Sequence, residues 1–282
     1  ARAINGETQT TESTWETMFE GLFATITNVD FDEEALRRLI ARVREEKEKL
    51  LPSCKVCREP CGRSEDYDMT LLWKEQEDIR SLKSLILLGV RGTAAYAWHA
   101  MALGYRDREL EQFLARALFA VGEDWEQERL LSVALEVGKY NLTAMEMLDK
   151  ANRENFGSPV PAKVPLAVEK GPFIVITGHD LRDLKLLLEQ TEGKGISVYT
   201  HGEMLPAHGY PELKKYPHLK GNFGTAWQNQ RKEFAGIPAP IVFTTNCLVP
   251  PADSYRDRVF TAGPVSFPGT VHIGEEKDFT PD

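Results

Sequence analysis

The first half of the chain carries the hydrophobic spacing that is typical of helices. Apolar residues recur every three or four positions over residues 31–51, 75–103, 107–121 and 124–152, which is the period of one helix face. Acidic side chains begin the first of these stretches and lysines end it, an order that complements the helix dipole. The pattern predicts a helical bundle domain over residues 1–155.

The hydrophobic pattern changes beyond this bundle. Residues 156–172 are rich in proline, which predicts a linker. Short β-branched runs follow at Phe173–Thr177 (FIVIT), Ile196–Thr200 (ISVYT) and Pro240–Thr245 (PIVFTT), with an amphipathic helix between the first two. Strands that alternate with helices at this spacing pair in parallel. We therefore expect the fold class α + α/β, in which a parallel-sheet, Rossmann-like α/β domain, incomplete in this chain, occupies residues 173–282.

Charge and composition narrow the range of partners. The 282 residues include 34 Lys and Arg against 43 Asp and Glu, which gives a net charge of −9. Nucleic acids and anionic membrane surfaces attract basic proteins, so we expect neither as a partner. No apolar run approaches the ~20 residues that a membrane span requires, and no signal-peptide pattern begins the chain. We expect a cytoplasmic protein.

The chain has four cysteines, and three of them are clustered. Cys54, Cys57 and Cys61 lie close together, whereas Cys247 is remote from them. Clustered cysteines without a secretion signal indicate reduced thiols or metal ligands. The cluster could hold an iron–sulfur centre, or zinc with a fourth ligand from elsewhere. The alternative is a surface loop with reduced thiols, and the incomplete ligand set favours that alternative.

A residue that can bind a metal follows each predicted strand. His179 follows the first strand, Glu203 the second and Cys247 the third. Because ligands bind at the carboxyl ends of parallel strands, these side chains converge if the strands are neighbours. Imidazole, carboxylate and thiolate together suit iron, or an iron centre with sulfur and oxygen bridges, better than structural zinc or an oxygen cage. Spacing leaves His201 and His208 as alternatives to His179 as the histidine ligand. A simpler interpretation needs no metal: the histidine caps a helix, and the cysteine is a small buried residue.

Several longer strings in the chain are distinctive. They are GLFATITNVDFD (Gly21–Asp32), GVRGTAAYAWHA (Gly89–Ala100), GHDL (Gly178–Leu181), YTHGEMLPAHGYPELKKYPHLKGNFG (Tyr199–Gly224), WQNQ (Trp227–Gln230) and TTNCLVP (Thr244–Pro250). Together these strings, which extend over most of the chain, resemble the hybrid cluster proteins, also called prismane proteins or hydroxylamine reductases. The string that begins at Tyr199 is too long and unusual for a chance match.

The resemblance implies a specific cofactor and activity. Members of that family hold a mixed iron–sulfur–oxygen (hybrid) cluster between α/β domains, beside a mostly helical domain. The resemblance places one ligand each at His179, Glu203 and Cys247, and implies no catalytic residue beyond the cluster ligands. It also implies cytoplasmic reduction of hydroxylamine to ammonia, or of nitric oxide, with electrons from a partner reductase through a proximal iron–sulfur cluster.

The resemblance covers only an internal portion of the family's sequence. The family's cysteine-rich segment for the proximal cluster, and its remaining hybrid-cluster ligands, have no equivalent between Ala1 and Asp282. We therefore expect either an internal piece of a longer protein or one chain of a divided protein, whose complementing chain carries the missing ligands. Two alternatives stay open, a non-catalytic scaffold or subunit fragment and a simple metal-binding protein that uses the Cys54, Cys57 and Cys61 loop.

Overall fold

The computed structural model describes residues 1, 4, 9–50 and 67–280. Its contacts divide the chain into two compact units, neither of which is continuous in sequence. The first unit contains Ala1–Phe23 and Arg37–Asp149, and the second contains Ala24–Leu36 and Lys150–Asp282. None of the helices within the described residues has the length and apolar character needed to cross a membrane.

The first unit is helical, as the hydrophobic spacing predicts. The helices that contribute to it are α2 (Glu12–Ala24), α3 (Glu33–Leu50), α4 (Thr70–Lys74), α5 (Glu77–Ala102), α6 (Arg108–Val121) and α7 (Gln127–Phe156). Its core includes Ile86 and Val90 of α5 with Leu114 of α6, all fully buried. Gly89 allows α5 and α7 to approach closely, because a Cβ atom there would lie 2.5 Å from Cγ1 of Val137.

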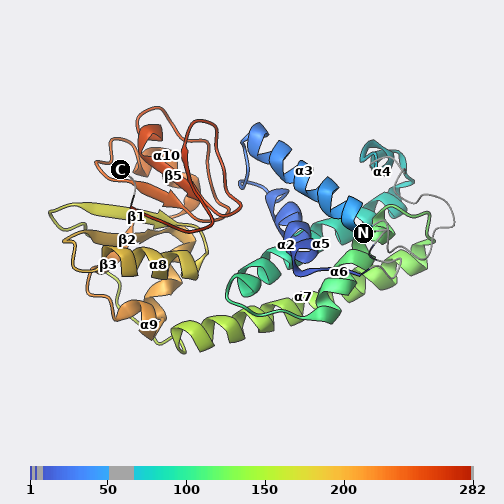
Figure 1. Ribbon diagram of the computed structural model, residues 1–282, viewed down its shortest axis with the longest axis horizontal. Coiled ribbons are helices and arrows are strands. Elements are labelled where there is room, and N and C mark those ends of the chain that lie inside the picture. The colour runs from blue at the N-terminus through green and yellow to red at the C-terminus, as the bar shows by residue number, and fades with distance from the viewer. Residues whose placement is uncertain (2–3, 5–8, 51–66, 281–282) are drawn as a thin grey trace. The chain divides into compact units, whose positions relative to one another are not determined.

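The second unit is built on a parallel sheet (Figure 1). Its strands are β1 (Phe173–Thr177), β2 (Ser197–His201), β3 (Leu219–Phe223), β4 (Ile241–Phe243), β5 (Val259–Ala262) and β6 (Val271–Ile273). Among the described residues they form one sheet of six in the order β3-β2-β1-β4-β5-β6, and each neighbouring pair is parallel. This is the strand order of the Rossmann fold, so the predicted fold class is confirmed.

Helix α8 (Leu181–Thr191) makes the crossover between β1 and β2. Asp180 begins it as the N-cap, and its side chain accepts hydrogen bonds from the backbone N–H groups of Arg182 and Asp183. A cap of this kind satisfies backbone donors that a helix start otherwise leaves unpaired. The capped start therefore fixes where β1 ends and where the residues between β1 and α8 lie.

Strand β3 lies at an edge of the sheet and is not predicted by the sequence. Its residues LKGNF include lysine, glycine and asparagine, which are poor strand formers. The strand forms because its backbone pairs with β2 and with the proline-rich segment, where the N–H of Asn222 donates to the Pro165 carbonyl at 2.9 Å. Gly221 permits this contact, since a Cβ atom there would lie 2.2 Å from that same carbonyl oxygen.

Candidate metal centre

Three side chains that can bind a metal meet at the carboxyl ends of the neighbouring strands β2, β1 and β4. One ligand atom each from His179, Glu203 and Cys247 lies within 4.8 Å of the other two. His179 Nε2 is 2.6 Å from Glu203 Oε2, and the Cys247 thiol donates to that same oxygen at 3.4 Å. Segments far apart in sequence thus place a nitrogen, an oxygen and a sulfur donor together, as the strand-end argument predicts.

The turn after β1 sets the position of His179. Gly178 has φ +114°, and a Cβ atom there would lie 2.5 Å from Thr244 Oγ1 and 2.8 Å from Thr245 Oγ1. The Thr245 hydroxyl accepts the backbone N–H of His179 at 2.9 Å and contacts its Nδ1 at 3.3 Å. Histidines that bind metals ordinarily have their second ring nitrogen held by such a partner, and here Nε2 is left facing Glu203.

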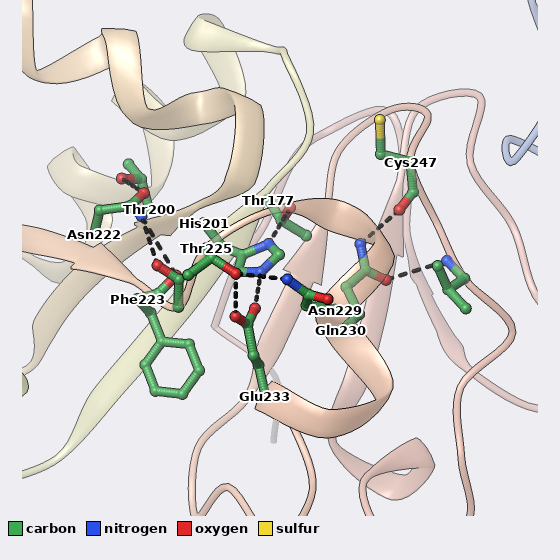
Figure 2. Close-up of polar contacts among 12 residues, drawn as sticks. Thr177, Thr200, His201, Asn222, Phe223, Thr225, Asn229, Gln230, Glu233 and Cys247 are labelled. Carbon is green, nitrogen blue, oxygen red and sulfur yellow. Dashed lines mark hydrogen bonds and ion pairs between the residues drawn. The ribbon is translucent and has the colours of Figure 1, made fainter. Parts of the chain in front are cut away.

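Glu203 lies in the short 3-10 helix η3 (Gly202–Gly209), directly after β2. The last residue of β2, His201, is fully buried. Its Nδ1 lies 3.1 Å from Thr177 Oγ1, and its Nε2 lies 3.0 Å from Glu233 Oε2 (Figure 2). Burial lowers the pKa of His201, and the hydrogen bond to Glu233 opposes that effect. His201 therefore anchors the strand end that carries Glu203.

His208, the other alternative to His179, also has a partner of its own. Its Nε2 lies 2.9 Å from the Thr200 hydroxyl, which donates to Asn222 Oδ1 at 2.9 Å. Burial lowers the pKa of His208, so the ring is a neutral member of a buried hydrogen-bond chain. Spacing leaves three histidines open, and the structure brings His179 alone of these three to Glu203 and Cys247.

The loop after β4 carries Cys247 and is held by the segment between α2 and α3. Asn28 Nδ2 donates to the Leu248 carbonyl at 2.8 Å, and the N–H of Leu248 donates to the Asn28 carbonyl at 3.0 Å. The side-chain amide and the backbone carbonyl of Asn28 thus hold the backbone of a residue 220 positions away. No pattern in the sequence indicates this contact, because it joins two loops that are remote in the chain.

The Glu203 carboxylate beside Cys247 favours a bound cation, whereas burial of the thiol opposes its ionisation. Burial raises the pKa of the Cys247 thiol to about 12, and the nearby Glu203 carboxylate contributes to the rise. Without a cation the thiol is therefore protonated near neutral pH, and a bound metal would displace that proton. A mixed nitrogen, oxygen and sulfur donor set differs from an oxygen cage for calcium or magnesium, and it fits iron. The three residues fit an iron-containing centre.

The second candidate metal site lies outside the described residues. Cys54, Cys57 and Cys61 fall within 51–66, so their metal binding stays a prediction. The described part of the chain adds residues that the sequence argument did not identify, above all Thr245 beside His179 and Gln230 beside the Cys247 loop. Gln230 belongs to the distinctive WQNQ string, but nothing in that string indicates its partner.

The chain is similar to known proteins of one family. Residues 3–281 match the model of the Prismane/CO dehydrogenase family. The chain is 48% identical over 277 residues to a hydroxylamine reductase of Thermodesulfovibrio yellowstonii, covering 93% of this chain and 51% of that protein. It is 52% identical over 230 residues to a hydroxylamine reductase of Moorella thermoacetica, covering 81% of this chain and 53% of that protein. The chain thus spans about half the length of the curated relatives it matches.

Proposed function

The chain belongs to the Prismane/CO dehydrogenase family, and on that premise we propose that it supplies His179, Glu203 and Cys247 to a hybrid iron–sulfur–oxygen cluster. The proposed enzyme is an oxidoreductase that reduces hydroxylamine. The observation that carries the proposal is the convergence of the three donor atoms within 4.8 Å at neighbouring strand ends. The names of the relatives, which are hydroxylamine reductases, supply the substrate.

The residues of this chain would hold the centre rather than transfer protons themselves. His179 would bind through Nε2 because Thr245 holds Nδ1, and Cys247 would bind as a thiolate after release of its proton. When bound, the cluster supplies the electrons for reduction. Hydroxylamine takes up two electrons and two protons, its N–O bond breaks, and ammonia and water are released. Nitric oxide is the second substrate that we propose for the same centre.

The proposal requires groups beyond these three side chains. Three protein ligands are too few for a large cluster, so we propose that a complementing chain, or further sequence of a longer protein, supplies the others. Electrons would come from a reductase, through a proximal iron–sulfur cluster. We propose a cytoplasmic location, where thiols stay reduced.

Iron content tests the proposed ligands. The protein is purified without oxygen together with any chain that accompanies it, and iron, acid-labile sulfide and visible absorption are measured. Cys247→Ser and His179→Ala should each lower iron and sulfide together and abolish hydroxylamine-dependent oxidation of a reduced dye, since each removes a ligand. The matched control replaces Cys54, Cys57 and Cys61 by serine, and it should keep the activity that depends on Cys247.

A full iron and sulfide content in the double variant His179→Ala/Cys247→Ser would contradict the proposal. A colourless, iron-free preparation of the unsubstituted protein with all its accompanying chains would favour the non-catalytic scaffold. Loss of iron from the triple serine variant alone would favour the simple metal-binding protein.

A further inference from the structure

Cys247 has a backbone conformation that residues with side chains rarely adopt. Its φ is +70°, in the left-handed region where a non-glycine residue costs roughly 1–2 kcal/mol. Such a residue persists when its surroundings hold it in place, and this conformation is common at functional sites. The groups that hold the Cys247 backbone therefore also determine where its thiol lies.

The side chain of Gln230 holds this backbone. Gln230 is fully buried; its Nε2 donates to the Cys247 carbonyl at 2.6 Å, and its Oε1 accepts the N–H of Val249 at 3.1 Å. Figure 2 shows the Cys247 thiol pointing away from the Gln230 amide. We propose that Gln230 is a positioning residue for Cys247, whose amide fixes the left-handed turn that directs the thiol toward Glu203.

The helix that carries Gln230 is itself fixed to the strand that precedes Glu203. Gln230 begins α10 (Gln230–Glu233), and Glu233 ends it. Glu233 accepts a hydrogen bond from the Thr225 hydroxyl, and its Oε2 lies 3.0 Å from Nε2 of His201. Since His201 is the last residue of β2, α10 joins the Cys247 loop to the strand end that positions Glu203. One helix thus sets the separation of two of the proposed ligands.

A second glutamine makes the same arrangement away from the site. Gln190 Nε2 donates to the Lys277 carbonyl at 2.8 Å, and its Oε1 accepts the N–H of Phe279 at 2.8 Å. Lys277 also has a left-handed backbone, with φ +51°. Both glutamines therefore hold a left-handed residue through its carbonyl and through the N–H two residues later. Gln190 is a matched control, because its loss removes the same contacts without touching a proposed ligand.

Cobalt binding tests this inference, which rests on the proposed function. The purified protein is titrated with Co²⁺ without oxygen, and the readout is the thiolate-to-cobalt absorption that Cys247→Ser removes. Gln230→Ala should weaken this binding by roughly 10- to 100-fold, the usual effect of losing a group that orients a metal ligand. Gln190→Ala should lower the free energy of unfolding about as much as Gln230→Ala does, but it should leave the cobalt titration unchanged.

Gln230→Met keeps the test decisive if Gln230→Ala does not fold. The methionine side chain has a similar size, but it cannot donate to the Cys247 carbonyl, so cobalt should again bind more weakly. Unchanged cobalt binding in the folded Gln230 variants, or equal weakening by Gln190→Ala, would overturn the inference. Absence of any Cys247-dependent absorption in the unsubstituted protein would overturn the proposed metal site and this inference with it.

Discussion

Gly178 is the residue on which the position of His179 depends most directly. Its backbone conformation is left-handed, and threonine hydroxyls fill the space where a side chain would begin. An alanine at this position would therefore meet two separate obstacles, backbone strain and steric overlap. Because the overlap is with Thr244 and Thr245, and Thr245 holds the His179 ring, the substitution would also displace the proposed ligand.

Gly178→Ala should cost about 3 kcal/mol or more of unfolding free energy, the range expected when a strained backbone and a steric clash combine. Gly193→Ala is the control, because Gly193 has φ +72° with no atom within 4 Å of an added Cβ. Its cost should be only the strain of about 1–2 kcal/mol. Urea unfolding measures both, and equal costs would show that the space beside Gly178 does not matter.

The residues of the candidate site can be predicted from the sequence only where their place in the chain, directly after a strand, determines which side chains lie close together. Glu203 and Cys247 each follow a strand, as does His179, and parallel strands bring their carboxyl ends to one edge. Spacing alone still leaves His201 and His208 as alternatives to His179. Thr245 and Gln230 were not predictable, since their contacts are with backbone atoms of turns. The conformation of such turns depends on tertiary packing, which no spacing rule describes.

Among the elements, α8 joins the proposed site to the segment at residues 277–279. Asp183, in its first turn, pairs with Lys277 at 2.9 Å, and Gln190 holds the backbone of Lys277 and Phe279. Asp183 is almost fully buried, and its Oδ1 has no hydrogen-bond partner within the described residues. A buried carboxylate with one unpaired oxygen is costly in its charged form.

The protonation of Asp183 should make stability depend on pH. Burial and the neighbouring Asp180 together raise the pKa of Asp183 from 3.8 to about 7, although Lys277 opposes the rise. Between these values the folded state binds a proton that the unfolded state releases, so the unfolding free energy falls as pH rises from about 4 to about 7. Asp183→Asn cannot titrate and should lose this part of the pH dependence.

Urea unfolding near pH 5 and near pH 7.5 measures that difference. The unsubstituted protein should lose more stability between the two conditions than Asp183→Asn does. An identical pH dependence in both proteins would show that Asp183 keeps the same protonation state on folding.

The elements themselves were predictable where a local pattern was strong. FIVIT and the helix after it form β1 and α8 as expected, because buried β-branched runs and amphipathic spacing are local signals. The strands β3, β5 and β6 were missed; β3 contains poor strand formers, and two of the three residues of β6 are exposed. The spacing of apolar residues does not show which face of α5 or α7 is buried. Leu85 and Leu88 of α5 and Leu135 of α7 are apolar but more than half exposed.

At the scale of the whole molecule, the two compact units do not follow one another along the chain. Residues 24–36 extend from the end of α2 to the first turn of α3 and belong to the second unit, whereas the residues on either side of them belong to the first. Besides the Asn28 contacts, the N–H of Ser266 donates to the Val29 carbonyl, and the N–H of Phe31 donates to the Ser266 carbonyl. The sequence shows a change of pattern near residue 155, but it gives no sign that an early loop returns to the sheet.

Asn28→Ala should loosen the Cys247 loop from a distance of 220 positions in sequence. The change removes the hydrogen bonds to the Leu248 carbonyl and from the Thr27 hydroxyl, and it places alanine at φ +63°. The amide of Leu248 should therefore exchange its hydrogen roughly tenfold faster or more. Hydrogen exchange read by mass spectrometry measures this, with the Phe279 amide as an internal reference that should not change. An unaltered Leu248 rate would mean that the loop holds its shape without Asn28.

The placement of β1 between β2 and β4 limits the stage of folding at which the proposed centre can be inserted. A chain emerging from the ribosome exposes His179 first and Cys247 last, and the three donors share one space only after β4 has docked beside β1. Insertion of the proposed centre would therefore follow the docking of β4 beside β1. Whatever binds there then favours the folded sheet by mass action.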